Sequence, residues 1–81
     1  MEDQDVMRRI DELDAEEHQL LASGEAKMGL DDAERTRLHE LHIELDRLWD
    51  LIRQRRARRH AGLDPEGAKL RSARVVEDYR Q

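Results

Sequence analysis

Five arginines stand within one short stretch of the second half of the sequence: Arg53, Arg55, Arg56, Arg58 and Arg59. A guanidinium group donates paired hydrogen bonds to carboxylates and to phosphates, so this run predicts a surface for an acidic protein partner. The alternative is RNA, whose phosphates the same groups could neutralise. We favour an acidic protein, or the chain's own tail, over RNA, because no aromatic side chains alternate with these arginines as stacking on single-stranded bases would require.

The first 23 residues are acidic, with eight carboxylates against Arg8 and Arg9. In an antiparallel hairpin the earliest of them would lie near the arginine-rich end, so charge pairing and the helix dipole explain part of the pattern. The formal net charge of −5 also argues mildly against binding nucleic acid through the whole surface. The eight are Glu2, Asp3, Asp5, Asp11, Glu12, Asp14, Glu16 and Glu17.

Glu17 stands where the apolar spacing of its segment calls for a hydrophobic residue. Burial disfavours the charged form of a carboxyl group, so a carboxylate at such a position is usually paired. Hairpin register brings it near residues 36–38, which makes Arg37, or His42 of either chain, the expected partner. We predict a buried polar pair that fixes the register of the helices.

Residues that could support metal binding or catalysis are few. His18, His39 and His42 lack the Glu-x-x-His spacing of di-iron bundles, and too few of them converge for zinc. The chain has no cysteine, no glycine-rich phosphate loop and few hydroxyl side chains. We therefore expect no cofactor, no metal, no small-molecule substrate and no enzymatic activity.

Two helices are expected to position these groups, over residues 4–22 and 32–60. In the first, Val6, Ile10, Leu13 and Leu20 recur at helical spacing, and Ser23-Gly24 and Gly29 predict the connection. The second carries a regular apolar stripe of Leu38, Leu41, Leu45, Leu48 and Ile52. Asp31 is expected to cap it together with Glu34, and Gly62 to end it.

The predicted organisation is a helical hairpin over residues 1–62 and a tail over residues 63–81. In the tail, Ser72 could cap a short last helix that contains Val75, Val76 and Tyr79. That helix would pack on the bundle.

The fold predicted from this pattern is all-α, an antiparallel helical hairpin that dimerises into a four-helix bundle. Eighty-one residues without cysteine bury little surface alone, and the apolar face of the second helix is wider than one helix can cover. We therefore expect a homodimer. Its predicted interface comprises Leu41, Leu45, Leu48, Trp49 and Ile52.

Three runs of residues stand out: Glu16-Glu17-His18, the run from Leu45-Asp46 through Trp49-Asp50-Leu51-Ile52-Arg53-Gln54-Arg55-Arg56-Ala57, and the ending Val75-Val76-Glu77-x-Tyr79. Together they resemble a family of short actinobacterial proteins catalogued only as a domain of unknown function. The resemblance implies a helical hairpin in a four-helix-bundle arrangement, with no established activity. It implies no functional residues.

The sequence contains no apolar run of the length that crosses a membrane. Its first residues lack the basic and apolar regions of a signal peptide. We expect a cytoplasmic protein that acts as a small interaction or structural module.

Overall fold

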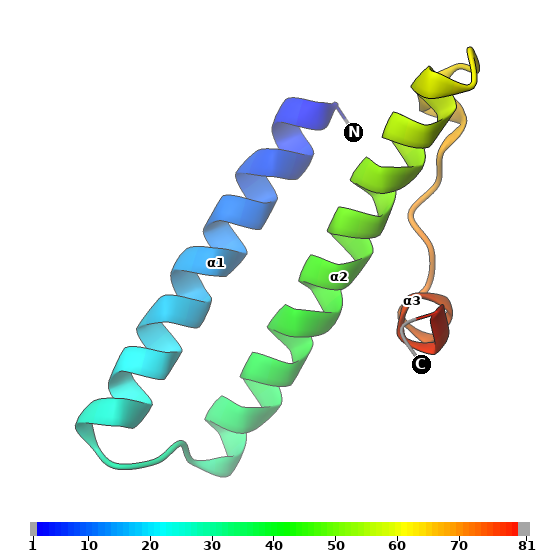
Figure 1. Ribbon diagram of the computed structural model, residues 1–81. Coiled ribbons are helices and arrows are strands. Elements are labelled where there is room, and N and C mark those ends of the chain that lie inside the picture. The colour runs from blue at the N-terminus through cyan, green and yellow to red at the C-terminus, as the bar shows by residue number, and fades with distance from the viewer. Residues whose placement is uncertain (1, 80–81) are drawn as a thin grey trace. The chain divides into compact units, whose positions relative to one another are not determined.

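A computed structural model describes residues 2–79 of the chain and the side chains of residues 2–77. The helices are α1 (Asp3–Ala26), α2 (Asp32–His60) and α3 (Ala73–Tyr79), with a short 3₁₀ helix η1 (Pro65–Gly67) between the last two (Figure 1). No strand occurs among these described residues, which confirms the all-α prediction. The chain divides into two compact units, residues 1–42 and residues 43–81, with the boundary inside α2.

Helix α1 is longer than predicted, because it continues through Ser23-Gly24 to Ala26. The expected break at this pair is wrong. Gly24 is buried, and a Cβ atom there would lie 2.5 Å from Cδ2 of Leu30. Gly24 thus provides space for Leu30 rather than a turn, which the sequence alone does not distinguish.

The chain leaves α1 through a left-handed residue that is not glycine. Met28 has φ 62°, and the N–H groups of Met28 and Gly29 donate to the carbonyl oxygens of Glu25 (3.3 Å) and Gly24 (2.7 Å). These two bonds form a Schellman motif, which satisfies carbonyl groups at the end of the helix. The turn therefore depends on a methionine in a conformation that glycine adopts at lower cost.

Both predicted ends of α2 are confirmed. The N–H of Glu34 donates to Oδ1 of Asp31 (2.7 Å), and the N–H of Asp31 donates to Oε1 of Glu34 (3.0 Å), which is the reciprocal capping box. At the other end, Gly62 has φ 75°, and the N–H of Leu63 donates to the carbonyl of Arg58 (2.8 Å). Glycine at this position ends the helix without strain.

In the first unit, α1 and the first turns of α2 run antiparallel on either side of the turn, as the hairpin prediction requires (Figure 1). The fully buried side chains are Val6, Ile10, Leu13 and Leu41. Three of them come from the predicted stripe of α1. The stripe ends there, because Leu20 is half-buried and Leu21 is exposed.

In the second unit, the tail turns back and runs beside the rest of α2 (Figure 1). The buried hydrophobic side chains are Leu45, Leu48, Leu51 and Val76. The N–H of Val75 donates to Oγ of Ser72 (3.3 Å), so Ser72 does cap a short helix, α3. The side chain of Tyr79 lies outside the described residues. The four-helix bundle and the division into residues 1–62 and 63–81 stay predictions.

Candidate functional site

The five arginines of the predicted partner surface have different environments. Arg55 is only 4% exposed, so it belongs to the interior and its assignment to the surface is wrong. Arg58 is half-buried and donates from Nε to the carbonyl oxygen of Asp64. Its guanidinium also lies against Gly67, where a Cβ atom would be 2.3 Å from Nη2. Arg58 therefore holds the tail rather than facing a partner.

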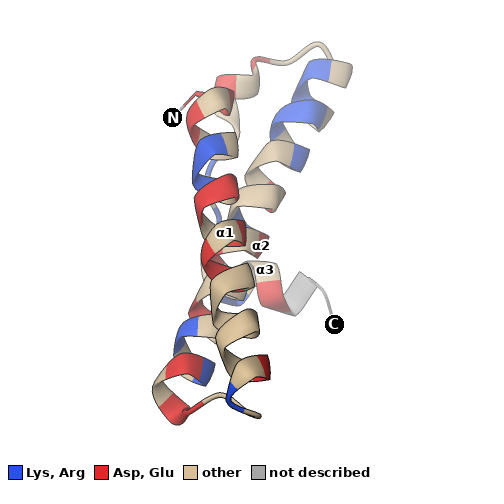
Figure 2. Ribbon diagram, turned by 90° about the vertical axis from the view of Figure 1, so that its left-hand side faces the viewer, with Lys and Arg blue, Asp and Glu red and all other residues tan. Residues whose placement is uncertain are grey.

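The remaining three arginines, Arg53, Arg56 and Arg59, are exposed. Figure 2 shows basic residues concentrated toward the C-terminal end of α2 and acidic residues spread along α1. The structure shows no hydrogen bond or ion pair for the guanidinium groups of Arg53 and Arg56 with another described residue. These two groups are available to a partner.

An exposed tryptophan shares a face of α2 with these arginines. Trp49, Arg53, Arg56 and His60 follow one another at intervals of four, three and four residues, so they lie on one side of the helix. Trp49 keeps 38% of its surface exposed, and the other three are exposed as well. We call this row the Trp–Arg stripe. Tryptophan and arginine, with tyrosine, are enriched among the residues that contribute most to binding at protein interfaces.

Of the predicted dimer interface, Leu41, Leu45 and Leu48 are buried within the single chain. Only Trp49, which is exposed, and Ile52, which is half-buried, keep surface for a second copy. The interface itself stays a prediction. Because the three leucines are buried within the chain, a second copy would have to contact Trp49 and the arginines that follow it.

The expected polar pairing involves two carboxylates instead of one. Glu17 pairs with Nε2 of His42, as predicted, whereas Arg37 pairs with Glu16. The Arg37 contact is bidentate, with Nε donating to Oε2 (2.5 Å) and Nη2 donating to Oε1 (2.8 Å). Because the side chain of His42 is 53% exposed and that of Arg37 is 38% exposed, neither pair is buried.

The Arg37 guanidinium lowers the pKa of the Glu16 carboxyl group below its ordinary value, chiefly through the hydrogen bonds. The same effect operates at the turn, where Lys27 lowers the pKa of Glu34. Both pairs join residues on either side of the turn between α1 and α2. They fix the register of the hairpin and supply no reactive group.

A set of contacts that the sequence did not predict holds the tail on α2. Three side chains of α2 donate to main-chain carbonyl groups of the tail: Arg47 Nε to Arg71 (2.8 Å), Gln54 Nε2 to Lys69 (2.7 Å) and Arg58 Nε to Asp64. We call this set the tail clasp. Its donors are spaced by seven and four residues, so they occupy one face of the helix. That spacing of polar side chains is the one sequence feature that could have predicted the clasp. Nothing in the tail sequence shows which of its carbonyl groups would accept the hydrogen bonds.

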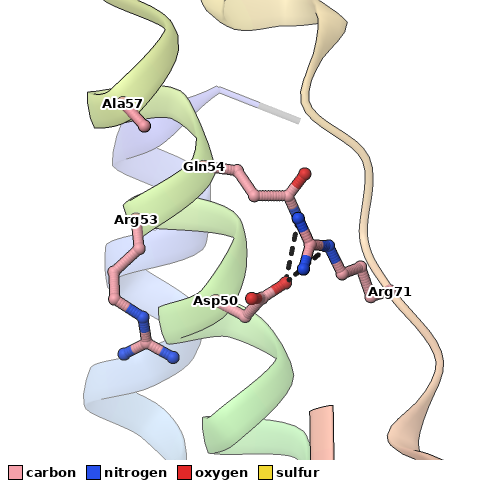
Figure 3. Close-up of a pocket in the computed structure, with 5 residues that line it drawn as sticks. All are labelled: Asp50, Arg53, Gln54, Ala57 and Arg71. Atoms are coloured by element: carbon pink, nitrogen blue, oxygen red, sulfur yellow. Dashed lines mark hydrogen bonds and ion pairs between the residues drawn. The ribbon is translucent and has the colours of Figure 1, made fainter. Parts of the chain in front are cut away.

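Next to the tail clasp lies a cavity of about 310 Å³ (Figure 3). It is lined by Asp50, Arg53, Gln54, Ala57 and Arg71. Nε2 of Gln54 donates to Oδ2 of Asp50 (2.8 Å), and Nε of Arg71 lies 3.6 Å from the same oxygen. In Figure 3, Arg53 extends from the helix on the side away from Arg71. The lining thus includes Gln54 of the tail clasp and Arg53 of the Trp–Arg stripe, and the carboxylate of Asp50 is already paired.

Two further findings concern the part of the chain that the structure describes. Among these residues, no three histidine, cysteine or carboxylate side chains are grouped so that they could hold a metal ion. None of the helices there has the length and apolar character needed to span a membrane.

The fold and this site define a class: a small all-α protein with a helical hairpin, a clasped tail and an exposed row of tryptophan and arginine. The chain belongs to the family described as protein of unknown function (DUF2630), whose model matches residues 2–81. It is 42% identical over 77 residues to uncharacterized proteins of Mycobacterium tuberculosis and Mycobacterium bovis, covering 95% of this chain and 88% of each relative. No solved structure matches. The predicted family resemblance is confirmed.

Proposed function

We propose that this protein is a small interaction module whose Trp–Arg stripe binds a partner that carries carboxylates. The single observation that supports this most is the exposure of Trp49 beside Arg53 and Arg56, whose guanidinium groups form no hydrogen bond or ion pair with another described residue. A tryptophan supplies apolar contact area, and each guanidinium can take a carboxylate in bidentate geometry. The proposal keeps the cytoplasmic location and the homodimer expected from the sequence.

The charge of the second unit supports an acidic partner. Residues 43–81 contain ten arginines and lysines against seven carboxylates, a net charge of +3 within a chain of net charge −5. Of the five arginines of the run, Arg53, Arg56 and Arg59 are exposed, and these three form the basic part of the proposed surface. A basic patch on an acidic protein favours selective binding over general attraction to anions.

RNA remains the second candidate, because Trp49 offers an exposed ring on the same face as Arg53. The two candidates differ in what one tryptophan can do. Continuous single-strand binding needs several stacking platforms, whereas a protein contact needs one anchor. The acidic protein partner is therefore preferred.

The test is a titration of the full chain against two fluorescein-labelled probes, a glutamate-rich peptide and a single-stranded oligouridine. We expect the peptide to bind and the Arg53→Ala/Arg56→Ala variant to weaken that binding about tenfold, since each removes a charge-assisted contact. Arg8→Ala/Arg35→Ala removes the same charge from exposed positions of the first unit and is the control. Tighter binding of the RNA, lost in the Arg53/Arg56 variant, would replace this function with the second candidate.

A further inference from the structure

We propose that the acidic partner of the Trp–Arg stripe is a second copy of this chain, which presents one face of its helix α1. The inference rests on the proposed function and names the partner for that same surface. It assigns a specific pair of residues, Asp11 of one copy and Arg53 of the other.

The two units of the chain carry opposite charge. Residues 1–42 contain 13 carboxylates and five basic side chains, a net charge of −8, whereas residues 43–81 have a net charge of +3. Two copies therefore attract each other when the first unit of one meets the second unit of the other. Complementary charge of this kind both accelerates encounter and disfavours other arrangements.

Helix α1 has an exposed row that matches the Trp–Arg stripe. Met7, Asp11 and Asp14 are separated by four and three residues, the same intervals that separate Trp49, Arg53 and Arg56. We call this row the Met–Asp stripe. Met7 keeps 38% of its surface exposed, Asp11 is exposed and Asp14 is half-buried. Each row thus begins with one large apolar side chain followed by two charges of one sign, and the Trp–Arg stripe continues to His60.

The charges of the Met–Asp stripe are not paired with any side chain that the structure describes. Most carboxylates of the first unit have a basic partner, as in Asp5 with Arg8, Glu12 with Arg9 and Glu16 with Arg37. In contrast, the carboxylates of Asp11 and Asp14 form no hydrogen bond or ion pair with another described residue. Two unpaired carboxylates on one helix and two unpaired guanidinium groups on another have the same spacing.

Asp11 is the middle residue of the Met–Asp stripe, and Arg53 is the middle one of the three residues Trp49, Arg53 and Arg56 that match it. They therefore face each other whether the two helices pair in parallel or antiparallel. In a two-fold dimer the contact is made twice, since each copy has both rows. The exposed side chains of Met7 and Trp49 become covered, which supplies the apolar part of the interface.

The experiment is sedimentation equilibrium of the full chain and of charge-reversal variants. We expect a dimer for the wild-type chain and a rise in the dimer dissociation constant of about tenfold or more for Asp11→Arg and for Arg53→Glu, because each places like charges together. An equimolar mixture of the two variants should recover the dimer, since one contact regains opposite charges with reversed sign and the other is unchanged. The double variant D11R/R53E should recover it as well.

Matched controls separate this contact from a general effect of charge. Glu12→Arg and Arg8→Glu make the same changes of charge next to the Met–Asp stripe, at exposed side chains of weak ion pairs. They should leave the dissociation constant within about twofold of the wild-type value. Circular dichroism establishes that each variant is helical, and Asp11→Asn with Arg53→Gln replaces any variant that fails to fold.

A wild-type chain that stays monomeric up to about 1 mM would overturn the inference. So would a mixture of the two variants that fails to recover the dimer, or controls that weaken it as much as the variants do. A monomer that still binds the glutamate-rich peptide through Arg53 would overturn the self-pairing alone and keep the proposed function. A monomer that does not bind the peptide either would overturn both the self-pairing and the proposed function.

Discussion

Replacing Gln54 by alanine should release the tail from α2. One nitrogen, Nε2 of Gln54, donates both to the carbonyl of Lys69 (2.7 Å) and to Oδ2 of Asp50 (2.8 Å). The Asp50 side chain is 13% exposed, so water replaces the lost donor poorly. A neutral hydrogen bond contributes about 0.5–1.5 kcal/mol and one to a charged group about 1.5–3 kcal/mol. Taking the low ends, the expected cost is about 2 kcal/mol.

The assay is hydrogen exchange of the backbone amides of α3, followed by NMR or mass spectrometry. The amide of Val76 donates to the carbonyl of Ser72 (3.1 Å), and we expect it to be protected only while the tail is docked on α2. A loss of about 2 kcal/mol corresponds to exchange about 30-fold faster. Amides of α1 should keep their wild-type rates, because the clasp lies within residues 43–81.

The control is Gln19→Ala, the same substitution at an exposed position of α1. Wild-type protection of Val76 in Gln54→Ala would refute the reasoning, since it would mean that Arg47, Arg58 and the burial of Val76 hold the tail without Gln54. Gln54→Glu gives a second reading at nearly constant shape. It places an acceptor beside Asp50 and should release the tail at least as much as alanine does.

Three further predictions concern the hairpin and its ends. Met28→Gly should raise the free energy of unfolding by about 1 kcal/mol and the melting temperature by several degrees. The reason is that Met28 has φ 62°, while its side chain is 95% exposed and contributes little packing. An unchanged melting temperature would contradict this. Gly62→Ala should lower stability by about 1 kcal/mol in the same assay, since φ 75° strains any residue with a Cβ atom, and a neutral result would count against strain at that turn. In acid, urea unfolding should show that the contribution of Glu16 is complete above pH 4.5, the ordinary pKa, and is lost as pH falls through its lowered folded-state pKa. Arg37→Gln should flatten that acid limb and Arg35→Gln should not, whereas equal acid limbs in the wild-type chain and Arg37→Gln would exclude the pairing as its cause.

The sequence predicted the helices well where the signals are local. Capping by Asp31 with Glu34, by Ser72 and by Gly62 depends on residues within three or four positions of each other, and all three are confirmed. The break at Ser23-Gly24 was wrong because the reason for Gly24 is Leu30, six residues away across the turn. Glycine as a turn residue and glycine as space for a neighbour look the same in one sequence.

The candidate site was only partly visible. A run of five arginines predicted a basic surface, but tertiary contacts decided which of them remain on it. Arg55 is buried and Arg58 is used by the tail, while Arg53 and Arg56 stay exposed beside Trp49. Likewise Glu17 pairs with His42, one of its two predicted partners, whereas Arg37 pairs with the neighbouring Glu16.

Helical periodicity and capping are short-range properties of the chain, so the sequence was enough to predict the all-α class, the two long helices and the caps of α2. The position of the tail, in contrast, depends on contacts between residues far apart in the chain. Arg47, Gln54 and Arg58 bind main-chain carbonyl groups, which every residue has, so no residue type in the tail could identify its partners. The contacts of the tail also determine which side chains of α2 can bind a partner, because a side chain that holds the tail is not free to bind anything else.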